Sequence, residues 1–208
     1  MSTRDVLMVA DLVGVAVFAA SGGSAAVAKR FDVFGVVFVG FVAALGGGVL
    51  RDLFIDVVPP VAFADWRYSV TAAVASLLVF RFHPQLVKLR RSVLLLDAAG
   101  LGLFTAASTL KALEAGVPAV GSCIIGMITG IGGGLARDIL TGEIPVVLRR
   151  EIYAVAALLG AIAVAVGFQI PVPDTPLMLA SAVFICTVRV VALRRRWDAP
   201  VARPDPGA

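Results

Sequence analysis

The sequence predicts an all-α integral membrane protein with seven transmembrane helices: an inverted repeat of three plus three helices, followed by a seventh. Three observations support this fold class. Hydrophobic residues make up 60% of the chain, and only 15% of residues are charged, whereas a soluble domain is close to half apolar. Apolar stretches of spanning length recur along the chain. The same residues also recur at a constant offset of 86 positions.

Seven apolar segments follow one another, divided by charged or proline-containing turns. A spanning helix needs about 20 mostly apolar residues, and the candidates are roughly 6–28, 33–57, 67–83, 92–114, 118–141, 151–169 and 176–193. The first segment continues into further apolar segments without a cleavage region, so we expect a span rather than a signal peptide. The polar, proline-rich residues 198–208 are expected to form a disordered cytoplasmic tail.

Basic residues predict the orientation of these spans. One face receives Lys29, Arg30, Arg81, Lys88, Arg90, Arg91, Arg149, Arg150, Arg194, Arg195 and Arg196. The other face receives Arg4, Arg67 and Lys111. By the positive-inside rule the protein lies in the inner membrane with a periplasmic N-terminus and a cytoplasmic C-terminus. Because these charges occupy short connections rather than a folded basic surface, we expect no nucleic-acid partner.

An internal repeat explains the order of the elements. At the offset of 86 the matched pairs are Asp11/Asp97, Gly14/Gly100, Phe18/Phe104, Ala20/Ala106, Gly35/Gly121, Gly40/Gly126, Arg51/Arg137, Asp52/Asp138 and Pro59/Pro145. A unit of three spans reverses direction when it is duplicated, which gives an inverted repeat. The predicted units are residues 1–91 and 92–175, followed by a seventh helix over 176–197.

Two glycine triplets lie in the second helix of each unit: Gly46, Gly47 and Gly48, and then Gly132, Gly133 and Gly134. Each glycine costs a helix roughly 1 kcal/mol relative to alanine, so we expect helices 2 and 5 to be kinked or broken there. The alternative is close helix packing. Unwound backbone is tolerated in a bilayer only beside protein or a watery cavity, so paired breaks point to a permeation pathway.

Each triplet is followed by an arginine and an aspartate, Arg51 with Asp52 and Arg137 with Asp138. Ionisable residues within spans are functional candidates, and they require partners. The helix directions predict one cluster at each mouth of a path, with Asp11 beside Arg51 and Asp97 beside Arg137. A gating or ion-guiding role and a purely structural salt bridge both remain open.

The other polar and aromatic residues carry weaker signals. Ser21 and Ser108 could line a path or form hydrogen bonds between helices. Tyr68 and Tyr153 are expected to be packing residues or interface anchors. The sequence has no catalytic motif and no cluster with metal-ligand spacing, so we expect no enzyme activity, no metal site and no cofactor.

Two copies of GGGxxRD, the second continuing as GGGLARDILTGEIP, resemble the prokaryotic trimeric intracellular cation (TRIC) channel family, also labelled UPF0126 or glycine transporter. The resemblance covers about residues 5–195. It implies a homotrimer in which each subunit has its own hourglass-shaped pore, with the two triplets as hinges. It also implies conduction of monovalent cations, chiefly potassium with sodium as a second permeant ion, and membrane lipids as partners. The lysine-rich voltage- and lipid-sensing features of the animal members have no match in this sequence.

Three functions therefore compete. The leading hypothesis is a passive potassium-permeable channel. The alternative is a secondary transporter for glycine or another small solute, because inverted repeats and broken helices serve both classes. A scaffold that only trimerises would leave the repeated Arg-Asp pairs without a purpose.

Overall fold

The computed structural model describes residues 3–86, 90–148, 152–195 and 197. Within these ranges the chain is helical and contains no strand, which confirms the predicted all-α class. The elements are α1 (Thr3–Ala28), α2 (Val33–Phe54), α3 (Val61–Ala64), α4 (Trp66–Leu86), α5 (Arg90–Glu114), α6 (Ala119–Leu140), the 3-10 helix η1 (Val146–Leu148), α7 (Tyr153–Gly167) and α8 (Asp174–Arg195). The predicted tail at 198–208 and the orientation signals Lys88, Arg149, Arg150 and Arg196 lie outside the described residues.

The seven long helices of the described chain fall on the seven predicted apolar segments, with their ends displaced by a few residues. Five of these helices are long and apolar enough to cross a membrane: α1, α2, α5, α6 and α8. The α7 helix is apolar but has only 15 residues, and α4 is not among the five. The short elements α3 and η1 were not expected, and each follows the second long helix of its half of the chain.

Helix ends repeat at the offset seen in the sequence. Asp56 follows the end of α2 with φ 59°, and Gly142 follows the end of α6 with φ 68°. In each case the next amide returns to a carbonyl in the last turn at 2.8 Å, from Val57 to Asp52 and from Glu143 to Asp138. A left-handed residue with this returning hydrogen bond ends a helix, and glycine adopts that conformation without strain. The local chemistry of the two halves therefore produces the same turn twice.

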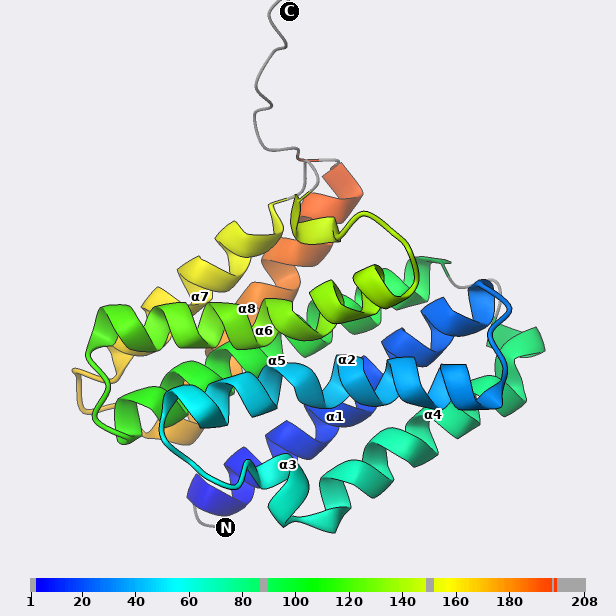
Figure 1. The fold of residues 1–208 in the computed structure, drawn as a ribbon. Coiled ribbons are helices and arrows are strands. Elements are labelled where there is room, and N and C mark those ends of the chain that lie inside the picture. The colour runs from blue at the N-terminus through cyan, green and yellow to red at the C-terminus, as the bar shows by residue number, and fades with distance from the viewer. Residues whose placement is uncertain (1–2, 87–89, 149–151, 196, 198–208) are drawn as a thin grey trace, which may run out of the picture.

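Four helices form the centre of the bundle, with α1 packed against α5 and α2 packed against α6 (Figure 1). The α3–α4 pair covers one side of this centre, and α7 and α8 cover the opposite side. At the contact of α1 with α5, the rings of Phe18 and Phe104 stack with centroids 5.4 Å apart. The two halves of the chain thus share one core rather than forming separate domains.

The glycine triplets lie where α2 meets α6. A Cβ atom on Gly47 would come within 3.0 Å of the Thr129 carbonyl oxygen, and one on Gly133 would come equally close to that of Ala43. At this contact the missing side chains let the two backbones approach one another. Close packing, the alternative to a helix break, is therefore present at the middle glycine of each triplet.

The break expected at the triplets is not present. Both α2 and α6 remain α-helical from end to end through their glycines. The physical reason is that the intrinsic cost of glycine in a helix is offset by the contact it permits with the neighbouring backbone. A bend within the continuous helix stays a prediction.

Candidate functional site

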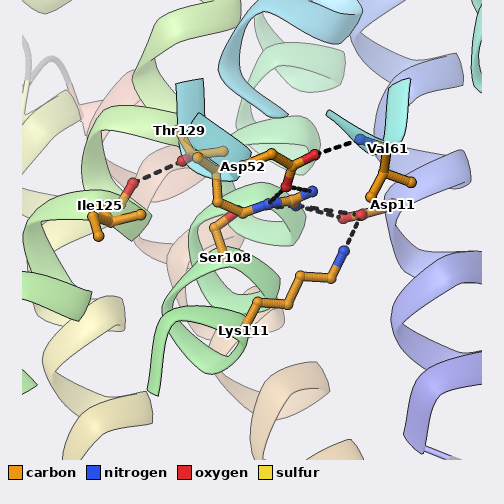
Figure 2. Close-up of polar contacts among 8 residues, drawn as sticks. Asp11, Asp52, Val61, Ser108, Lys111, Ile125 and Thr129 are labelled. Atoms are coloured by element: carbon orange, nitrogen blue, oxygen red, sulfur yellow. Dashed lines mark hydrogen bonds and ion pairs between the residues drawn. The ribbon is translucent and has the colours of Figure 1, made fainter. Parts of the chain in front are cut away.

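The first polar cluster is formed by Asp11, Arg51, Asp52, Ser108 and Lys111, from helices α1, α2 and α5. Arg51 Nε donates to Asp52 Oδ1 at 2.8 Å, and its Nη1 donates to Asp11 Oδ1 at 3.2 Å. The Arg51 Nη1 also lies 3.5 Å from the Ser108 hydroxyl. Figure 2 shows Lys111 reaching from α5 toward Asp11, and its ammonium donates to Asp11 Oδ2.

These charges are buried almost completely. The Arg51 and Asp11 side chains are 2% and 1% exposed, whereas that of Lys111 is 19% exposed. A buried charge is tolerated when it is paired and its hydrogen-bonding atoms are satisfied. Two cations here face two carboxylates, so the first cluster carries no net charge when all four groups are ionised.

The second polar cluster is formed by Ser21, Asp97, Arg137 and Asp138, from α1, α5 and α6. Arg137 Nη1 donates to Asp97 Oδ1 at 2.7 Å and to the Ser21 hydroxyl at 2.6 Å. Arg137 Nε donates to Asp138 Oδ1 at 2.9 Å. The structure therefore contains both pairings expected from the sequence, Asp11 with Arg51 and Asp97 with Arg137.

Asp52 and Asp138 each hold the element that follows their helix. The second oxygen of Asp52 accepts from the Val61 amide at 2.9 Å, and that of Asp138 accepts from the Val146 amide at 2.9 Å. Each carboxylate thus joins its neighbouring arginine to the first residue of α3 or η1. This role was missed because elements of three or four residues have no sequence periodicity.

These contacts also correct one repeat assignment. The carbonyl of Pro60 accepts from the Phe63 amide, and that of Pro145 accepts from the Leu148 amide, both at 2.9 Å. Pro60, and not Pro59, is therefore the structural equivalent of Pro145. The connection after α6 is one residue shorter than the connection after α2, so the repeat is not ungapped to this point.

Both tyrosines are buried beside the clusters, which agrees with the packing alternative of the two roles expected from the sequence. Tyr68 is 5% exposed and Tyr153 is 2% exposed. The guanidinium carbon of Arg189 lies 4.8 Å from the Tyr153 ring centroid, and Arg189 itself is 1% exposed. Sequence reasoning missed Arg189, although an arginine inside the apolar run VFICTVRVVAL was the available signal.

A small cavity adjoins the first cluster. One glycine of the first triplet, Gly48, is part of its wall, whereas Gly46 has open space where a side chain would begin. The complete lining is Asp11, Val15, Ala44, Leu45, Gly48, Arg51, Asp52, Ala62, Tyr68 and Phe104. In the second triplet, Gly132 packs toward Gly47 and Gly134 faces Asp97 and Tyr153.

The same two helices connect the clusters. Helix α1 supplies Asp11 to the first cluster and Ser21 to the second, while α5 supplies Ser108 to the first and Asp97 to the second. Ten residues of helix separate Asp11 from Ser21, which corresponds to about 15 Å. That separation is about half the thickness of a bilayer core. The arrangement therefore places two buried polar clusters in series along an otherwise apolar bundle.

The sequence of this chain is similar to those of known membrane proteins. A family model described as glycine transporter matches residues 8–84 and again residues 94–169. The UPF0126 inner membrane protein YadS of Escherichia coli strain K12 is 39% identical over 199 residues, which cover 94% of this chain and 95% of that protein.

Solved structures are also similar to this chain. The TRIC trimeric intracellular cation channel orthologue from Rhodobacter sphaeroides is 33% identical, with a TM-score of 0.87 over 92% of this chain and 98% of that one. A TRIC channel solved to explain conductance is 32% identical, with a TM-score of 0.86 over 95% of this chain and 97% of that one. The chain therefore belongs to the UPF0126 membrane protein family, within which it is a prokaryotic TRIC-type member.

Proposed function

We propose that this protein is a passive, potassium-permeable cation channel that works as a homotrimer, with one pore in each subunit. The observation that carries the proposal is the pair of buried Asp/Arg clusters, in which each arginine is bound by two carboxylates, about 15 Å apart within the bundle. The likeness to structures named as trimeric cation channels supports both the activity and the assembly.

The charge arrangement is compatible with cations. An unpaired arginine in a narrow path would repel a potassium ion, but Arg51 and Arg137 are each held between two carboxylates. Carboxylate, hydroxyl and carbonyl oxygens are the ligands that hard cations prefer. In this proposal potassium is the main permeant ion and sodium a second one, with no cofactor and no catalytic step.

The proposed pore also depends on the arrangement of the helices in the membrane. In our proposal seven helices span the inner membrane, and residues 1–91 and 92–175 form an inverted repeat. The repeated turns at Asp56 and Gly142 and the double family match support this duplication. The N-terminus is periplasmic and the C-terminus cytoplasmic, with lipids surrounding the bundle. The triplets Gly46–Gly48 and Gly132–Gly134 bend when the pore opens.

A secondary transporter for glycine is the second candidate. The observation in its favour is the description of the matching family as glycine transporter. A transporter would use the polar clusters as gates on either side of one solute site. A channel instead carries ions down their gradient without saturable uptake of a solute.

Proteoliposomes loaded with potassium chloride separate the two candidates. The channel proposal predicts potassium efflux from liposomes that contain the protein and none from potassium-loaded liposomes without it. External glycine should not change the rate of efflux. Radiolabelled glycine should accumulate in the protein-containing liposomes no faster than in liposomes without the protein. Saturable glycine uptake without potassium efflux would overturn the proposal in favour of the transporter.

A further inference from the structure

Two glycines at matching positions of the repeat have different surroundings. A Cβ atom on Gly48 would have only the Arg51 Nη2 nearby, at 4.0 Å. A Cβ atom on Gly134 would lie 3.0 Å from Asp97 Oδ1 and 3.1 Å from the Tyr153 hydroxyl. The space beside Gly48 belongs to a cavity, whereas the space beside Gly134 is filled by Tyr153 and Asp97.

The carboxylates of the two clusters are also bonded differently. Asp11 accepts from Arg51 and, through Oδ2, from Lys111. Asp97 uses Oδ1 for Arg137, while its Oδ2 has no hydrogen-bond partner among the described residues, and the same holds for the Tyr153 hydroxyl. Buried polar atoms without partners are rare and mark places that rearrange or bind water. The second cluster therefore has unused hydrogen-bonding capacity beside Tyr153, whereas the corresponding carboxylate of the first cluster is bound by Lys111.

Arg189 also contacts the ring of Tyr153. Its guanidinium lies over that ring in a buried cation–π contact, an interaction that strengthens when water is excluded. Arg189 belongs to α8, which lies outside the two repeated units and packs against α5 and α7. The seventh long helix therefore places a buried cation beside the second cluster.

From these contacts we propose that Tyr153 closes the path at the second cluster, and that Arg189 is the positioning residue that keeps it closed. The first cluster, with its cavity beside Gly48, is then an open vestibule. The absence of a side chain at Gly134 permits the close approach of Tyr153, and opening requires Tyr153 to move away from it. The inference rests on the proposed channel function, and it makes the two ends of the pore functionally unequal.

Single-channel recordings in potassium chloride test the role of both residues. Arg189→Met removes the cation but keeps an unbranched side chain, and we expect the ratio of open to closed time to rise roughly tenfold, as loss of a desolvated cation–π contact implies. Arg189→Lys should restore part of the closure, and Tyr153→Ala should open the path further. Arg195→Met, which removes a cation near the end of the same helix where it lies over Trp197, should leave opening unchanged. Unaltered opening in both Arg189→Met and Tyr153→Ala, with both proteins folded, would overturn the proposal.

Thiol labelling tests the closure without any current. In a Cys123→Ala, Cys186→Ala background, Gly48→Cys should react with a charged, membrane-impermeant reagent at least roughly tenfold faster than Gly134→Cys. This factor equals the change expected above in the ratio of open to closed time. Adding Arg189→Met should bring the Gly134→Cys rate toward the Gly48→Cys rate. The new side chain at position 134 would itself push Tyr153 away and so favour labelling. Slow labelling in spite of this is therefore strong support for the closure. Equal rates in the two single-cysteine proteins would exclude the closure, whether or not the protein carries potassium.

Discussion

At the scale of single residues, the two buried arginines account for most of the site. Arg51 and Arg137 each bind an aspartate 40 positions earlier in the chain and the aspartate that follows them directly. Removing one partner of such a pair leaves an uncompensated buried charge, which typically costs about 3–5 kcal/mol. We therefore expect the loss of either partner to destabilise the fold, whatever further part the pairs take in conduction.

A double-mutant cycle measures the coupling within a pair. We expect Asp11→Asn and Arg51→Gln to be coupled by about 1–3 kcal/mol in the free energy of unfolding, because both groups are buried and share a hydrogen bond. The measurement is denaturant unfolding in detergent micelles. The exposed pair of Asp65 with Arg67, at 2.5 Å, is the control and should show less than about 1 kcal/mol. Equal coupling in the two cycles would contradict the burial argument.

The two serines of the clusters should differ in their effect. Ser21 lies 2.6 Å from Arg137, whereas Ser108 lies 3.5 Å from Arg51, at the limit of a hydrogen bond. Hydrogen bonds to charged groups contribute about 1.5–3 kcal/mol, so Ser21→Ala should lower the midpoint of thermal unfolding more than Ser108→Ala. A larger effect from Ser108→Ala would contradict the expectation that the shorter hydrogen bond, that of Ser21 with Arg137, contributes more to stability.

At the scale of the elements, α2 and α6 show what sequence reasoning can reach. The pairing of Asp11 with Arg51 was predictable, because charges inside a bilayer need partners and helix directions limit the choice. The continuity of the helices at Gly47 and Gly133 was not, because the cost of a glycine depends on what its missing side chain lets approach. The contact of Arg189 with Tyr153 was hidden because α8 has no counterpart within the repeat.

Alanine substitution separates packing from hinge behaviour within a triplet. Gly47→Ala and Gly133→Ala should lower the free energy of unfolding, because the new Cβ would come within 3.0 Å of a backbone carbonyl oxygen on the facing helix. Gly46→Ala meets nothing within 4 Å and should stabilise the protein by up to about 1 kcal/mol through helix propensity. Calorimetry in detergent measures the thermal stability of the three alanine variants and so checks their predicted order. If Gly46→Ala proved as damaging as Gly47→Ala, the packing explanation would fail.

The matched helix ends predict opposite responses. Asp56 holds φ 59° on an exposed turn, so Asp56→Gly should stabilise the protein by about 1 kcal/mol. At the equivalent turn Gly142 holds φ 68°, so Gly142→Ala should destabilise it by a similar amount. Thermal unfolding of both variants provides the measurement, and a shift of the same sign in both would contradict the shared turn geometry.

At the scale of the whole molecule, two similar halves enclose one set of polar contacts. The central helices α1 and α5 each contribute to both clusters, so neither half can form either site alone. The halves differ where Lys111 binds Asp11 at one end and Arg189 covers Tyr153 at the other. The two halves thus place similar arginine–aspartate pairs in both clusters, and these two contacts are where the clusters differ.

The central claim is that cations cross the membrane through this bundle. Its most direct test is the reversal potential of purified protein in a planar bilayer under a tenfold gradient of potassium chloride. Selective cation permeation predicts discrete current steps that reverse near the potassium potential, about 59 mV in magnitude. A reversal near the chloride potential, or no current from folded protein, would contradict the claim.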